Sequence, residues 1–119
     1  MGLNRVALAE GLLFAKAVGL DPQLTLDVLK QGNASSVVMD VKGRKMIDHD
    51  FSAQGKLSQH LKDVRLILEK ARHFGLPLPG SQLHENLLVF AEELGLGERD
   101  NSAIISAIEN FGNKSLNDE

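Results

Sequence analysis

The stretch KLSQHLKDVRLILEKARHFG, residues 56–75, has the clearest periodicity in the chain and predicts one amphipathic helix. At about 100° per residue, its apolar side chains fall within one narrow arc that we expect to face a core: Leu57, Leu61, Val64, Leu68 and Ala71. Lys62 points almost directly away from this arc, and Leu66 lies beside Lys62 on the same outward face. Two interpretations remain open: this face meets water with one exposed leucine, or it contacts something else.

The same approach predicts helices along the whole chain and no strand, because no segment alternates apolar and polar residues over a sustained length. The first expected helix covers residues 1–18, and residues 76–80 should interrupt the helices because Pro77 and Pro79 restrict the residues before them. Four side chains are expected to cap helices at their start: Asp21, Ser35, Ser81 and Asp100. The expected fold is one all-α domain of about six helices over residues 1–111, followed by a polar tail, 112–119.

Composition limits the classes of function. The 119 residues are 43% hydrophobic, which suits one domain with its own core. A net charge of −3 argues against a general nucleic-acid binder, and no apolar run is long enough to cross a membrane. The absence of cysteine excludes a thiolate metal site, and with no signal peptide at the N-terminus it favours a cytoplasmic location.

The titratable residues do not form a self-contained active site in the sequence. Residues 48–50 read Asp-His-Asp, but adjacent side chains point in different directions, so we expect no metal there. His60 lies close to the core arc, and Asp63 follows three residues later. A local hydrogen bond between these two is favoured over a catalytic dyad. No Gly-rich phosphate loop follows a strand.

Five motifs nevertheless occur in a specific order: LNRVALAEGLLFAKAVGLDPQLTLDVL (3–29), GNASSVV (32–38), DFSAQGKLSQHLKDVRL (50–66), GLPLPGSQL (75–83) and GLGERDNSAI (95–104). Together they resemble the C-terminal domain of the β-hydroxyacid dehydrogenases. That family includes 3-hydroxyisobutyrate dehydrogenase, tartronate semialdehyde reductase and the glyoxylate/succinic semialdehyde reductases, with 6-phosphogluconate dehydrogenase as a distant relative. The resemblance covers residues 3 to about 108.

The resemblance implies a two-domain enzyme whose N-terminal Rossmann domain holds NAD or NADP and whose active site lies between the domains. It implies that Lys62 is the lysine of the family's Lys-Asp pair and reaches the cofactor, while Leu66 could pack against the other domain. Asp63 is then a structural hydrogen-bond acceptor. The family's catalytic Lys-x-x-x-Asn motif would lie upstream of Met1, so we expect no catalytic residue in this chain and no cofactor bound to it alone.

Two positions depart from the family pattern. Val37 stands where an aromatic residue is usual, and Gly55 stands where relatives often have phenylalanine, which leaves the substrate class open. The leading hypothesis is the substrate and oligomerisation domain of an NAD(P)-dependent oxidoreductase for a small β-hydroxyacid or semialdehyde. It should form a homodimer or larger homo-oligomer, because the first helix is apolar around most of its circumference. The alternative is a non-enzymatic helical interaction module on the same scaffold.

Overall fold

The computed structural model describes the backbone of residues 2–32 and 36–117, and the side chains of this range up to Phe111. Within it, the all-α prediction is confirmed, since the described residues contain no strand. Six α-helices and one short 3-10 helix follow one another: α1 (Gly2–Ala17), α2 (Pro22–Gln31), α3 (Val37–Asp48), α4 (Leu57–His73), α5 (Pro79–Glu93), η1 (Asn101–Ala103) and α6 (Ile104–Asn117).

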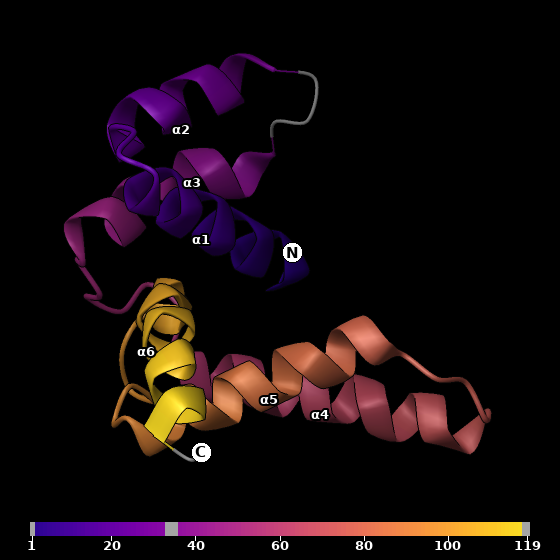
Figure 1. The fold of residues 1–119 in the computed structure, drawn as a ribbon. Helices are drawn as coiled ribbons and strands as arrows, with labels where there is room; N and C mark the ends of the chain where they lie inside the picture. The colour runs from indigo at the N-terminus through magenta and orange to yellow at the C-terminus, as the bar shows by residue number, and fades with distance from the viewer. Residues whose placement is uncertain (1, 33–35, 118–119) are drawn as a thin grey trace.

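The helices form two groups, which Figure 1 shows one above the other. Helices α1, α2 and α3 pack on one another, while α4 and α5 form a long antiparallel pair whose base contacts α6. Helix α1 joins the groups, because it also packs against α5 and α6. The apolar arc predicted for α4 is buried, and it belongs to one core that draws side chains from all six helices.

The predicted helix boundaries are confirmed in part. Asp21 caps α2 by accepting a hydrogen bond from the Gln23 backbone N–H at 2.9 Å. Asp100 caps η1 in the same way through the Ser102 backbone N–H. The cap expected at Ser35 lies outside the described residues, and α3 follows Ser36, whose side chain makes no capping bond.

The cap predicted at Ser81 is wrong, because α5 already begins at Pro79. Proline fits the first position of a helix, where its fixed φ is helical and its missing N–H would have had no partner. The second proline of the segment therefore starts the helix instead of delaying it. At the other end of the chain, α6 continues to Asn117, past the boundary expected at Phe111.

Helix α1 has one buried and one exposed face. Its buried face carries the apolar side chains that meet the other helices: Val6, Leu8, Ala9, Leu12 and Ala15. On the opposite face, Leu3, Phe14 and Val18, just beyond its end, are 46%, 69% and 55% exposed. The described chain therefore leaves apolar surface uncovered along α1.

Candidate functional site

Lys62 lies on the exposed face of α4, as its position in the sequence predicts. Leu66, one turn later, is 64% exposed, whereas Leu61 beside Lys62 in the chain is 1% exposed. Among the described side chains, Lys62 makes no hydrogen bond or ion pair. Its ammonium group is thus available on a face that also presents an apolar side chain.

The loop before η1 lies beside this face. Glu98 forms an ion pair with Lys56, whose Nζ lies 2.9 Å from its Oε2. This pair is the main reason that the pKa of the Glu98 carboxyl lies below the ordinary value. Lys62 is close enough to lower the Glu98 pKa further by a smaller electrostatic effect. The start of α4 therefore places two lysines around one exposed carboxylate.

A buried carboxylate fixes the two loops that form this edge. Asp100 is fully buried and accepts hydrogen bonds from the backbone N–H groups of Gln54, at 2.9 Å, and Gly55, at 3.1 Å. It also accepts from Ser102 and from the Lys42 ammonium, whose Nζ lies 2.9 Å from both carboxylate oxygens. We call this group the Asp100 clamp: Asp100, Lys42, Gln54, Gly55 and Ser102.

Backbone hydrogen bonds extend the Asp100 clamp to the start of α4. The N–H of Leu57 donates to the Arg99 carbonyl and that of Ser58 to the Gly97 carbonyl, both at 2.9 Å. Burial alone would raise the pKa of Asp100, but its donors outweigh that effect and hold the pKa well below the ordinary value. The carboxylate is therefore charged at neutral pH, and it orders the approach to Lys62.

Sequence reasoning identified Asp100 as a cap but missed Lys42 as its partner. The two residues are 58 positions apart, and Lys42 lies in α3, the helix with the least regular pattern. Its burial, at 6% exposed, follows from the packing of α3 against η1. No local spacing signals such a pair.

A second buried cation lies where α1, α4 and α5 meet. Arg5 is 4% exposed, and its guanidinium lies within hydrogen-bond reach of both ring nitrogens of His60, with Nδ1 at 3.2 Å, so it donates to whichever nitrogen carries no proton. The His84 ring lies beside that of His60, with centroids 5.3 Å apart, and its buried Nε2 has no hydrogen-bond partner among the residues that the structure describes. We call these three residues the histidine cluster. The hydrogen bond expected between His60 and Asp63 is wrong, because His60 pairs with Arg5 and Asp63 is exposed.

Both histidines are held neutral. Burial is the largest cause that lowers the pKa of His60 to about 4, and the charge of Arg5 adds to it. The same two causes lower the pKa of His84 to about 4. Burial also lowers the pKa of Arg5, and no carboxylate lies within ion-pair distance of it among the described residues. The arrangement suits structural packing and has no nucleophile or acid–base pair.

The Asp-His-Asp stretch does not gather around one point. Asp48 pairs with Arg44 at 2.8 Å, His49 lies 3.6 Å from Glu109, and Asp50 accepts from Ser52. Within the part of the chain that the structure describes, no group of three or more histidine or acidic side chains is placed to hold a metal ion.

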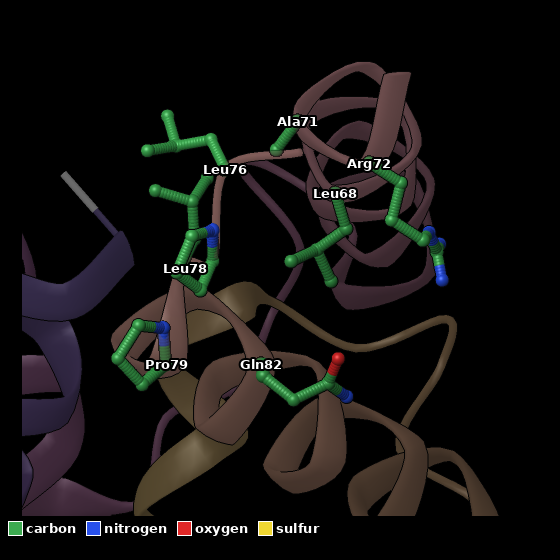
Figure 2. Close-up of a pocket in the computed structure, with 8 residues that line it drawn as sticks. Leu68, Ala71, Arg72, Leu76, Leu78, Pro79 and Gln82 are labelled. Atoms are coloured by element: carbon green, nitrogen blue, oxygen red, sulfur yellow. The ribbon is translucent and has the colours of Figure 1, made fainter. Parts of the chain in front are cut away.

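An apolar cavity of about 400 Å³ opens between the end of α4 and the start of α5. Figure 2 shows Leu68 and Ala71 of α4 on one side, Leu76, Leu78 and Pro79 on the other, and Gln82 below them. Its single charged lining residue, Arg72, points its guanidinium away from Leu76 and Leu78. Lys62 does not line this cavity, so it does not connect the lysine to a closed binding pocket.

Comparisons with known proteins give a consistent picture. Residues 1–108 match a family model described as NAD-binding of NADP-dependent 3-hydroxyisobutyrate dehydrogenase. The chain is 34% identical over 116 residues to 2-hydroxy-3-oxopropionate reductase of Escherichia coli (strain K12), covering 98% of this chain and 40% of the reductase. A crystal structure of 3-hydroxyisobutyrate dehydrogenase from Salmonella typhimurium superimposes with a TM-score of 0.84 at 25% identity, over 88% of this chain and 37% of that one.

A further relative has a different kind of name. The chain is 33% identical over 103 residues to the cytokine-like nuclear factor N-PAC of Aedes aegypti, covering 87% of this chain and 18% of that protein. The chain thus spans less than half the length of each of these relatives. None of the helices that the structure describes has the length and apolar character needed to cross a membrane.

Proposed function

Because the chain belongs to the 3-hydroxyisobutyrate dehydrogenase family, we propose that it forms the helical C-terminal domain of an NAD(P)-dependent oxidoreductase. The substrate class is a small β-hydroxyacid or semialdehyde. The observation that carries the proposal is the family match over residues 1–108, whose description names NAD binding. A cytoplasmic location agrees with the absence of cysteine, because a chain without cysteine holds no disulfide, as is usual for proteins in a reducing compartment.

Lys62 is the residue of this chain that contacts the cofactor in the proposal. Support comes from its exposure and from the lack of a hydrogen bond or ion pair among the described side chains, which leave an ammonium able to donate to a phosphate or hydroxyl oxygen. The Asp100 clamp orders the loops beside it. The bound nicotinamide supplies hydride chemistry, while Lys62 binds and orients the cofactor.

Catalysis requires residues beyond those of this chain. The described site contains neither a lysine and asparagine facing one pocket nor an acid–base pair, and Lys62 lies on an open face. We therefore expect the 119-residue chain by itself to bind no cofactor tightly and to turn over no substrate. Mixing it with NADH or NADPH and a panel of small semialdehydes tests this, and turnover above a buffer blank would contradict the proposed division of labour.

Self-association is the second part of the proposal. Leu3, Phe14 and Val18 leave apolar surface along α1, and such a surface favours a partner when it extends over several turns. A homodimer with α1 at or near the interface is the simplest closed assembly. Sedimentation at micromolar concentration measures it, and a monomer of 12.9 kDa throughout that range would remove this part.

A non-enzymatic helical interaction module is the alternative, and the likeness to a protein named as a nuclear factor favours it specifically. The two functions predict different domains encoded upstream of this chain. Reading the coding sequence upstream of Met1 separates them: an in-frame cofactor-binding domain supports the enzyme, and any other in-frame domain supports the module.

In an enzyme so encoded, Lys62→Ala should raise the KM for the cofactor while leaving the fold intact. Loss of one charge-assisted hydrogen bond costs about 1.5–3 kcal/mol, or roughly ten- to a hundredfold. Lys70→Ala is the matched control, because Lys70 is exposed on the same helix and lies 5.8 Å from the Phe74 ring. If the Lys62 variant behaves like the Lys70 variant, the cofactor role of Lys62 is wrong.

A further inference from the structure

We propose that the histidine cluster, Arg5, His60 and His84, is an acid-sensitive latch that holds the first turn of α1 on the α4–α5 pair and releases it when the histidines become protonated. The latch is a property of this chain and does not depend on the proposed enzymatic function. Its three side chains come from three different helices, so a change in their charge acts directly on how those helices pack.

The first turn of α1 lies directly over the two rings. A Cβ added at Gly2 would overlap the His84 ring and would lie 2.9 Å from Nε2 of His60. Leu3 touches the first turn of α5, where a Cβ at Gly80 would lie 3.4 Å from its Cδ1. There is no spare volume between this turn and the histidines, so an added water shell around a charged ring requires the turn to move.

The charged side chain that contacts the cluster's histidines is positive. Arg5 contributes a fixed positive charge from α1, which lowers the pKa of both rings. The opposing charges are Asp63 of α4, which is exposed and acts on His60, and Asp100, which acts on Arg5 from a distance. Neither carboxylate is within ion-pair distance of the cluster. A proton on either histidine therefore adds a buried positive charge with no counter-charge in contact.

Hydrogen bonding makes the closed latch specific for neutral histidine. The guanidinium of Arg5 donates to His60, and a ring nitrogen can accept only when it carries no proton. Protonation replaces this bond by contact between two cations. His84 offers no compensation within the described chain, since its buried Nε2 has no acceptor there to which a proton could be donated.

The direction of the pH effect follows from the lowered pKa values. His60 and His84 have pKa values of about 4 in the closed latch, against 6.5 for a free histidine. Between these values the open form binds more protons than the closed form, so acid favours opening. The latch is fully closed above about pH 6.5 and loses its stabilisation as the pH falls toward 4. The α4–α5 pair keeps its own apolar contacts throughout, which confines the release to α1.

NMR of the 119-residue chain tests the proposal. The ring Cε1–H signals of His60 and His84 report protonation, and NOEs between the Leu3 methyls and Gly80 report the closed latch. We expect the NOEs to disappear between about pH 6 and 4 over the same range in which the two rings titrate, while circular dichroism retains the helical signal. NOEs that persist after both rings are protonated, or that vanish before either titrates, would overturn the latch.

Two variants and one control sharpen the result. His84→Phe keeps a ring that cannot be protonated, and His60→Gln keeps an acceptor for Arg5. Each should reduce the population of the open latch at pH 5, by roughly tenfold for one histidine. His73→Phe is the control, because His73 is an exposed histidine in the last turn of α4. Equal opening in the wild type and both cluster variants would contradict the proposal, and the wild-type titration stands if a variant fails to fold.

Discussion

The protein buries a cation in two places, and the two cations differ in the groups that contact them. In the Asp100 clamp, Lys42 is 6% exposed and lies 2.9 Å from both oxygens of a buried carboxylate. In the histidine cluster, Arg5 is 4% exposed and donates to an imidazole, and no described carboxylate is in contact with it. Both charges have lost most of their water, but only the first has gained an opposite charge.

The difference shows what makes a buried charge useful to a fold. Removing an ion from water costs several kcal/mol, and only close pairing with further hydrogen bonds offsets that cost. The Asp100 clamp meets this condition, because the donors around the carboxylate come from helix α3, from the loop before α4 and from η1, which it thereby joins. The histidine cluster fills space but leaves its charge unbalanced, so its contribution depends on keeping two neighbours neutral.

Breaking the clamp should have the largest effect. Asp100→Asn keeps the size of the side chain but leaves the Lys42 charge buried and unpaired, which should cost about 3–5 kcal/mol. Urea unfolding followed by circular dichroism at pH 7 measures the loss. Arg44→Ala, which removes an exposed ion pair with Asp48, is the control and should change stability by less than about 1 kcal/mol. Equal losses in the two variants would show that the clamp is not a special source of stability.

As the pH falls, the histidine cluster should lose its stabilisation first and the Asp100 clamp later. The folded pKa of Asp100 lies below its ordinary value of 3.8, so its stabilisation is present above that value and is lost only as the pH falls below it. The histidines lose theirs between 6.5 and about 4. Lowering the pH from 7 to 4.5 should therefore reduce the free energy of unfolding by on the order of 2 kcal/mol for each histidine of the cluster. The loss should be smaller in His84→Phe and unchanged in His73→Phe.

Removing the unbalanced cation should have a small effect, of opposite sign to the loss in the clamp. Arg5→Met removes a buried charge that no described carboxylate contacts, and this gain offsets the loss of the hydrogen bond to His60. We expect the free energy of unfolding at pH 7 to change by less than about 1 kcal/mol, with less sensitivity to acid. If the free energy of unfolding falls by more than about 2 kcal/mol in the same urea experiment, the charge of Arg5 must be compensated by a partner in the folded chain.

The smallest effect belongs to the exposed cation. Lys62→Ala in the 119-residue chain should alter stability by no more than about 0.5 kcal/mol, because the side chain is exposed and forms no hydrogen bond or ion pair with the described side chains. Thermal unfolding by circular dichroism measures this change. A large shift in the melting temperature would make Lys62 structural and would remove the basis for assigning it to the cofactor.

Local patterns explain how much of this structure could be predicted from the sequence. The periodicity of α4 correctly placed Leu61 inside and Lys62 outside, because both follow from one helix and its turn angle. Asp21 and Asp100 were recognisable as caps, since capping acts over two or three residues. The partners of Asp100 and His60 were not, because Lys42 and Arg5 lie 58 and 55 positions away and reach them only through tertiary packing. The start of α5 was missed for a local reason, the ability of Pro79 to open a helix.

The long sequence separation within the Asp100 clamp also affects the rates of folding and unfolding. Apart from the bonds of Ser102, its hydrogen bonds join residues 45, 46 and 58 positions apart, so they can form only after large loops have closed. Interactions that form after the rate-limiting step do not speed refolding, but each must be broken before the chain can open. The clamp should therefore set the lifetime of the folded chain, and Asp100→Asn should accelerate unfolding far more than it slows refolding.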